Sequence, residues 1–253
     1  MTSHLLSHRH RDMQEKTNQL VTSATINRSQ NQILKINIRA DEPITLDGTS
    51  MQDVNDFVYL GSKITTDGDS KVDVQARISK VTGAYAALRS IWRSSKISNH
   101  TNVRIFKSNV LGVLLYGAES WKVTNAITTR LDVFQTRCLR RILRIFWPNT
   151  ISNEELYKRT NTIPLSQEIK RGRWTCIGHV CRMHPTSIPR VALRWTPTGK
   201  RKRGRPKETW RRSVEKEMKE KDWTWGQVQH WSHDRQAWKS LVMALCAFQH
   251  EED

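Results

Sequence analysis

The chain has 253 residues, with 42 Lys or Arg against 24 Asp or Glu and a formal net charge of +18. Its mean hydropathy is −0.65, and no apolar run is long enough to cross a bilayer, which disfavours a membrane protein. A balance this basic favours a nucleic-acid partner over a small-molecule substrate, and the N-terminus lacks the apolar run of a secretory signal.

The N-terminal part predicts one helix followed by short strands. Residues 1–60 hold six Lys or Arg against seven Asp or Glu, so this part is slightly acidic. Residues 12–25 have helical spacing, whereas residues 32–39 alternate between apolar and polar. Residues 44–46 and 57–65 also predict strands, each followed by an Asp-Gly turn. We expect these three strands to form a small antiparallel sheet.

Helical periodicity begins at residue 70 and dominates the rest of the chain. The clearest predicted helix spans residues 128–146 and ends before Pro148. Its apolar face is opposed by an arginine stripe: Arg137, Arg140, Arg141 and Arg144. Further helices are predicted over residues 154–160, 166–183, 209–220 and 232–248, while the prolines at 185, 189 and 197 predict a broken, extended segment. The fold class is therefore mainly α with a small N-terminal antiparallel sheet.

The charge is concentrated in residues 170–213. This stretch holds fourteen Lys or Arg and one acid, Glu208, with tryptophans interleaved. Phosphates would neutralise such a stretch, and flat aromatic rings stack on bases. Trp174 and Trp210 are the expected stacking residues. Together with the arginine stripe, the predicted nucleic-acid-binding residues are Arg171, Arg173, Trp174, Lys200, Arg201, Lys202, Arg203, Arg205, Lys207, Arg211 and Arg212.

Two other motifs each allow more than one interpretation. Cys176, His179, Cys181 and His184 are potential zinc ligands, but all lie within nine residues, so a continuous helix could not bring them around one ion. Core thiols and surface histidines are the preferred interpretation, and the four cysteines show no disulfide framework. The sequence of residues 203–206, Arg-Gly-Arg-Pro, resembles an AT-hook, which reads the A·T minor groove. The surrounding basic run would also serve for nuclear localisation, so we expect a nuclear or cytoplasmic protein.

Several ordered segments resemble one family. The segments FVYLGSKITTDG, ARISKVTGAYAALRSIW, VRIFKSNVLGVLLYGAESW, LDVFQTRCLRRILRIFWPNTISNEELYKRT, RGRWTCIGHVCRM and GKRKRGRPKETWRR are similar to the C-terminal part of the reverse transcriptases of non-LTR (LINE-type) retrotransposons. The resemblance is greatest to the endonuclease–reverse transcriptases of blood flukes.

This resemblance implies a division of the chain. Residues 1–69 would be a palm remnant with a primer-grip-like hairpin at Phe57, Tyr59, Leu60 and Gly61. Residues 70–148 would be the helical thumb, which clamps a template–primer duplex. Residues 149–253 would be a basic C-terminal region with an exposed loop at 196–208. The implied partners are RNA or DNA and the missing polymerase portion, with no membrane and no small-molecule substrate.

The chain also departs from the family pattern. Family polymerases bind two Mg²⁺ ions through an Ala-Asp-Asp element, which is absent here. We therefore expect no catalytic residue, metal or cofactor in this chain, and a fragment that binds nucleic acid without polymerising it alone. The alternatives are an enzyme whose other half acts in trans or is missing only because the gene assignment is incomplete, a host-retained AT-hook-like chromatin-binding protein, and a remnant with no function.

Overall fold

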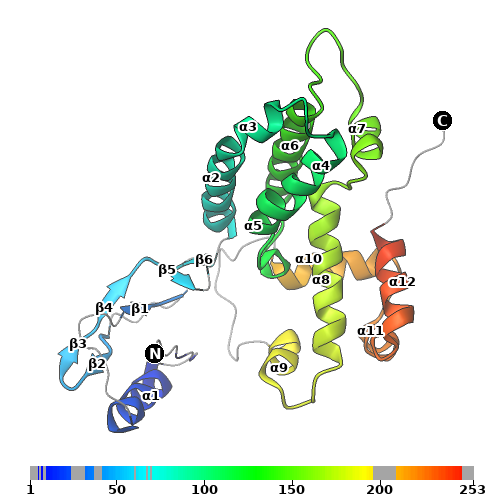
Figure 1. Ribbon diagram of the computed structural model, residues 1–253. Coiled ribbons are helices and arrows are strands. Elements are labelled where there is room, and N and C mark those ends of the chain that lie inside the picture. The colour runs from blue at the N-terminus through cyan, green and yellow to red at the C-terminus, as the bar shows by residue number, and fades with distance from the viewer. Residues whose placement is uncertain are drawn as a thin grey trace. The chain divides into compact units, whose positions relative to one another are not determined.

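A computed structural model describes residues 5, 7, 10–23, 32–36, 42–59, 61–66, 68, 70–195 and 209–246. The described chain is mainly helical with a few short strand pairs, as the sequence predicts (Figure 1). It divides into two compact units, one centred on residues 1–73 and the other on residues 74–196 and 200–253.

The described part of the N-terminal unit contains helix α1 (His10–Ser23) and three two-stranded pairs. Strand β1 (Gln32–Leu34) runs parallel to β4 (Gln52–Val54). Strands β2 (Thr45–Leu46) and β3 (Thr49–Ser50) form a hairpin around Asp47 and Gly48, which both have positive φ. Such a turn suits the right-handed twist of a two-residue hairpin. The small antiparallel β element is thus confirmed, but the three predicted strands belong to separate pairs and do not join in one sheet.

Residues 57–65, predicted as one strand, form a hairpin. Strand β5 (Asp56–Tyr59) pairs antiparallel with β6 (Ser62–Thr65), so that Phe57 lies opposite Ile64. The chain reverses direction where Gly61 takes a φ of +81°, a conformation that a side chain disfavours. A glycine inside an alternating run therefore marked a turn, as the resemblance implied and the alternation alone did not.

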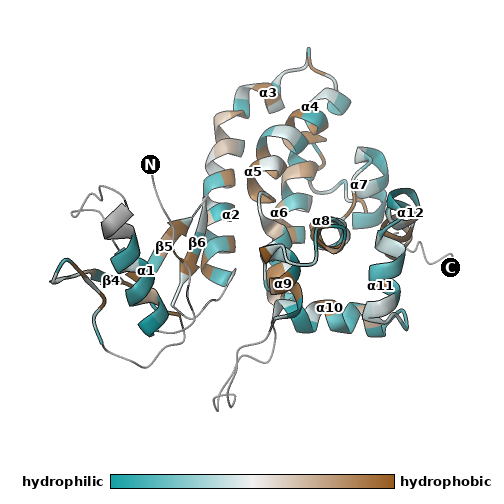
Figure 2. Cartoon of the chain, turned by 90° about the horizontal axis from the view of Figure 1, so that it is seen from below, coloured by the Kyte–Doolittle hydropathy of each residue, from teal (hydrophilic) through white to brown (hydrophobic). Residues whose placement is uncertain are grey.

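The second unit contains the remaining helices. In chain order they are α2 (Ser70–Ala87, which begins just before the division), α3 (Arg89–Arg93), α4 (Asn99–Ile105), the π-helical segment η2 (Phe106–Leu111), α5 (Gly112–Leu114), the short 3-10 segment η3 (Ala118–Ser120), α6 (Asn125–Ile142), α7 (Asn153–Thr160), α8 (Leu165–Cys181), α9 (Ile188–Arg194), α10 (Trp210–Lys219), α11 (Trp225–Ser232) and α12 (Arg235–Leu245). Coloured by hydropathy, α2 alternates between hydrophobic and hydrophilic residues along its length, as expected for a helix with one packed face (Figure 2).

Two hydrophobic cores share helix α8. The first core gathers α2, α4, η2 and α6 and extends along the chain to Leu165 and Ile169 in the first turns of α8. The second core takes Trp174, Ile177 and Cys181 from the same helix and packs them against α10, α11 and α12. Figure 1 shows α8 running from beside α6 past α10, α11 and α12. The first core also includes Leu156 and Tyr157 of α7, and Ile151 packs against it. Residues 151–169 therefore pack with the helices that precede them.

Two predicted boundaries differ from the structure. Helix α6 ends at Ile142, four residues before the predicted end, because Arg144 turns the chain at a φ of +57°. Pro185 and Pro189 do not keep that segment extended: Pro189 lies in the first turn of α9, where its fixed φ and missing N–H are tolerated, and Pro197 lies outside the described residues.

Candidate nucleic-acid interface

Arg173 and Trp174, two predicted nucleic-acid ligands, lie inside the second core. Their exposed fractions are 2% and 0%. Arg173 Nη1 donates to Glu217 Oε1 over 2.9 Å, and Trp174 Nε1 donates to Glu217 Oε2 over 2.6 Å. One carboxylate from α10 thus satisfies two buried donors from α8. A ring with no exposed face cannot stack on a base, so the surface roles predicted for both residues are wrong.

Other predicted residues on α8 and α10 are engaged in local contacts. Arg171 forms an ion pair with Glu168, one turn earlier on the same helix. Arg211 Nη2 donates to the carbonyl oxygens of Leu193 and Trp195 over 3.0 and 2.9 Å. Such contacts hold the helix ends in place and leave these guanidinium groups less available to phosphates.

The remaining predictions in the basic stretch have different outcomes. Trp210 Nε1 donates to Glu119 O over 2.7 Å, which ties α10 to the segment η3 and leaves the ring half-buried against the second core. Arg212 is half-buried and makes further contacts. Lys200, Arg201, Lys202, Arg203, Arg205 and Lys207 lie outside the described residues, as do the AT-hook-like motif and the predicted loop 196–208.

The arginine stripe of α6 divides into structural and exposed members. Arg140 Nη2 donates to Ile151 O over 3.1 Å and to Asn153 Oδ1 over 2.8 Å. Arg144 Nη2 donates to Arg93 O over 2.9 Å. Arg140 thus binds the segment that follows α6, and Arg144 binds the end of α3. Arg144 also lies beyond the last residue of α6 and so is not on the face of that helix. We therefore exclude Arg140 and Arg144 from the candidate interface.

Arg137 and Arg141 are exposed on consecutive turns of α6, and Arg130 adds a third exposed arginine two turns earlier. Within the described chain, no hydrogen bond or ion pair connects these three side chains to another residue. The carboxylate of the nearby Asp132 instead accepts hydrogen bonds from Ser166 N over 3.1 Å and from Ser166 Oγ over 2.9 Å. This surface, which we call the α6 arginine face (Arg130, Arg137 and Arg141), carries three positive charges. The sequence-based prediction missed Arg130, although its spacing of seven residues from Arg137 is helical.

The electrostatic effect of this face reaches the groups beneath it. Burial raises the pKa of Cys138 to about 12, while the positive charges of Arg141 and Arg137 act in the opposite direction. Burial also raises the pKa of Tyr85 to about 12, and again Arg141 opposes the shift. The two arginines thus produce a positive potential that an approaching phosphate would meet.

The loop after α6 carries two exposed aromatic rings that the sequence-based prediction missed. Trp147 is 88% exposed and Phe146 is 60% exposed. Every residue from 146 to 150 is exposed, whereas Ile145 and Ile151 at the two ends pack against the first core. Figure 1 shows this loop rising beyond the helices that it joins. We call residues 146–150 the aromatic loop.

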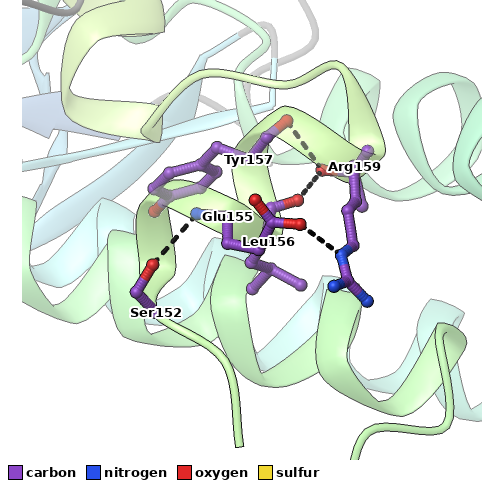
Figure 3. Close-up of polar contacts among 6 residues, drawn as sticks. Ser152, Glu155, Leu156, Tyr157 and Arg159 are labelled. Atoms are coloured by element: carbon purple, nitrogen blue, oxygen red, sulfur yellow. Dashed lines mark hydrogen bonds and ion pairs between the residues drawn. The ribbon is translucent and has the colours of Figure 1, made fainter. Parts of the chain in front are cut away.

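Both ends of the aromatic loop are fixed by hydrogen bonds. At the start, Ile145 N donates to Arg140 O over 2.9 Å and Arg144 N to Arg141 O over 3.3 Å, the pair of bonds that defines a Schellman motif. At the far end, the Ser152 Oγ caps α7 by accepting from Glu155 N over 3.1 Å (Figure 3). The loop therefore projects from a rigid base.

Helix α7 offers a contrast to the α6 arginine face. Arg159 Nε lies 2.6 Å from Glu155 Oε1, one turn earlier, and Figure 3 shows the two side chains pointing toward each other. The hydrogen bond from Arg159 lowers the pKa of Glu155, which keeps this acid ionised. Arg159 is thus largely neutralised by its own helix, and α7 adds little to the positive surface.

The primer-grip-like residues lie on the β5–β6 hairpin. Phe57 is half-buried, whereas Val58, Tyr59 and Gly61 are exposed, and Leu60 lies outside the described residues. The two edges of a two-stranded hairpin and an exposed tyrosine are compatible with binding a nucleic-acid strand. The assignment to a primer grip stays a prediction.

The described residues form no clear centre for metal or small-molecule chemistry. Among the described residues, no three His, Cys, Asp or Glu side chains come together as metal ligands would. Cys181 is buried in the second core, whereas Cys176 is exposed on α8. A cavity of about 560 Å³ between α6, α8 and α10 has both Lys170 and Glu220 in its wall, so its charges do not favour one sign of ligand. Within the described ranges, no helix has the length and apolarity of a membrane span.

Comparisons with known proteins indicate a transposon origin. The chain is 25% identical over 204 residues to an uncharacterised transposon-derived protein of Caenorhabditis elegans, an alignment that covers 77% of this chain and 72% of the relative. Residues 84–116 match a domain of unknown function, DUF6451, in the segment from the end of α2 to α5. No solved structure matches the chain.

Proposed function

We propose that this chain is a nucleic-acid-binding part of a LINE-type reverse transcriptase and that it contacts phosphates through the α6 arginine face. The observation that carries the proposal is the exposure of Arg130, Arg137 and Arg141 on one face of a helix without an acidic partner among the described residues. The transposon-derived relative and the net charge of +18 agree with this proposal.

The physical argument rests on the cost of leaving the face unneutralised. Three like charges on one helix face, two of them on neighbouring turns, repel each other and destabilise the helix slightly unless anions lie nearby. A phosphate backbone offers regularly spaced anions, and each contact releases condensed counterions, which makes binding favourable at low salt. The rigid side of a helix keeps the three guanidinium groups in a line that one strand can follow.

In this proposal the helices α2 to α6 act as the clamp implied by the resemblance, and residues 200–207 add further cations. The substrate would be a template–primer duplex or a target DNA. The chemistry of the contact is the same for RNA and DNA, because both present phosphates.

The test is a binding titration of a fluorescently labelled duplex from about 50 to 200 mM salt. We compare the wild type with the double variant Arg137→Gln/Arg141→Gln. If each arginine contacts one phosphate, the slope of log K against log salt should become shallower by about 1.8, roughly 0.9 for each phosphate that the variant no longer neutralises.

A charge-matched control separates local contacts from net charge. Arg159→Gln/Arg171→Gln also removes two positive charges, but both arginines are paired with acids on their own helices. This control should keep the wild-type slope. Equal slopes for the two double variants, or no binding by the wild type at low salt, would refute the proposal.

A further inference from the structure

The aromatic loop presents two flat rings to solvent at the end of a basic helix. Trp147 at 88% and Phe146 at 60% are among the most exposed large apolar residues of the described chain. Transfer of such rings from water to an apolar environment is favourable. A partner that covers the two rings would therefore gain binding free energy from their burial. The two rings are therefore a candidate contact surface for a binding partner.

The base of the loop shows that this exposure is built in. Ile145 and Ile151 are packed against the first core, and Arg140 bridges Ile151 O and Asn153 Oδ1 across the loop. Arg144, two residues before the loop, donates to the carbonyl oxygen of Arg93. Four anchored residues thus hold a five-residue tip outward, and little ordering is needed before a ligand binds.

The charges around the loop identify the class of occupant. Arg141 lies in the last turn of α6, directly before the loop, and Arg137 lies one turn earlier. The exposed Arg93, at the end of α3, is joined to the loop base through its carbonyl. An aromatic ring beside several arginines matches the pattern of single-strand binding, in which bases stack on rings while cations hold the backbone.

The size of the tip argues against a protein partner. Stable protein interfaces bury roughly 800 Å² and draw on about 20–30 residues on each side, more residues than a five-residue tip supplies by itself. A base needs only one ring face, and the indole of Trp147, which is 88% exposed, offers more than that. Unpaired bases are accessible to such a ring, whereas the bases within an intact duplex are stacked on one another.

We infer that Trp147 stacks on an unpaired base, so that the aromatic loop binds single-stranded nucleic acid next to the phosphates held by the α6 arginine face. The inference rests on the proposed nucleic-acid binding and specifies its substrate: a strand with unpaired nucleotides, such as the single-stranded region beside a duplex. Phe146 provides a second, less exposed ring beside it.

The experiment uses three probes of about 20 nucleotides, longer than the roughly 4–16 nucleotides that a small binding domain covers. They are a labelled single strand, the same strand with abasic sites in place of its bases, and the matching blunt duplex. Affinities are measured at one salt concentration for the wild type and for Trp147→Ala, Trp147→Leu and Trp147→Phe. Ile188→Ala is the control, since Ile188 is 83% exposed on α9 and has no ring.

Trp147→Ala should weaken binding to the intact strand by roughly 5- to 150-fold, the loss expected when one stacking partner is removed. Its affinity for the abasic strand and for the duplex should equal that of the wild type. Trp147→Leu keeps apolar area without a ring and should behave like the alanine variant, while Trp147→Phe should recover most of the affinity. Ile188→Ala should match the wild type on all probes.

The inference is overturned if Trp147→Ala binds the intact strand as tightly as the wild type, or if Trp147→Leu does so. In either case the salt slope of the α6 variants would still test phosphate binding separately. If the wild type binds none of the three probes, the proposed function itself is rejected. Circular dichroism of each variant checks the fold, which should not change because Trp147 is almost entirely exposed.

Discussion

Replacing Gly178 with alanine tests the packing of α8 against α12. A Cβ at this position would lie 2.1 Å from Trp238 Nε1 and 2.6 Å from two further atoms of the same ring. Carbon atoms in proteins do not approach this closely, so the indole would have to move by roughly 1 Å or more. Trp238 is only 3% exposed and donates from Nε1 to Trp174 O over 3.1 Å, so that movement also breaks a buried hydrogen bond.

The expected decrease in stability follows from these distances. Overpacking a core costs about 1–3 kcal/mol, and an approach this short belongs at the upper end. The broken hydrogen bond adds about 1 kcal/mol. Alanine returns about 1 kcal/mol relative to glycine within a helix. We therefore expect Gly178→Ala to lower the free energy of unfolding by about 3 kcal/mol.

Gly172 provides the matched control on the same helix. A Cβ there would lie 3.6 Å from the nearest atom, Glu119 Cγ, which is an ordinary contact. Gly172→Ala should therefore stabilise the protein by about 0.5–1 kcal/mol. Urea unfolding followed by circular dichroism measures both variants, and a double variant Gly178→Ala/Trp238→Phe should recover part of the loss. If the two alanine variants have equal stability, Trp238 does not pack against Gly178 and the second core is arranged differently.

Two further predictions concern the buried carboxylate and the exposed thiol. Glu217→Gln removes the negative charge that pairs with the buried Arg173 and should lower the free energy of unfolding in urea by about 3 kcal/mol. Glu155→Gln, at an exposed pair on α7, should leave that free energy close to the wild-type value. Equal effects of the two variants would contradict the burial of the Arg173–Glu217 pair. Of the four thiols, Cys176 alone should react with a disulfide reagent in the folded protein, and Cys176→Ser should abolish the reaction. Desolvation raises the pKa of Cys176, so the rate should still increase as the pH rises past 9. Fast reaction of several thiols at neutral pH would contradict the structure.

The helices were predictable because their apolar residues follow one period over long segments. Helices α6 and α8 lie close to the predicted residues, since spacings of three and four residues survive in any tertiary arrangement. The end of α6 was missed because a positive φ at Arg144 is rare for an arginine and leaves no pattern in the sequence. The alternation alone missed the hairpin at residues 56–65, which only the family resemblance implied, because one glycine determines whether an alternating run continues or turns.

The candidate site was less predictable than the fold. Trp174 shares a face with Ile177 and Cys181, and this spacing could have placed it in the core despite its basic neighbours. The pairing of Arg173 with Glu217, 44 residues away, has no local signal. Trp147 did have one, because it follows a helix end, precedes a proline and fits no apolar face. An aromatic residue outside every periodic pattern is a better candidate for ligand contact than one embedded in basic residues.

Charge along the chain also differs from charge on the surface, because arginines here close the ends of neighbouring helices. Arg144 donates to the last carbonyl of α3, Arg182 donates to the last carbonyl of α11 over 2.7 Å, and Arg211 donates to carbonyls at the end of α9. The final carbonyls of a helix lack partners within it, and a guanidinium with several donors satisfies them well. Each such arginine counts toward the formal charge, but its guanidinium group is bound to protein carbonyls and is less available to phosphates. The salt dependence of binding should therefore report a few phosphate contacts, set by the α6 arginine face and the basic residues 200–207, rather than a number that scales with the net charge of +18.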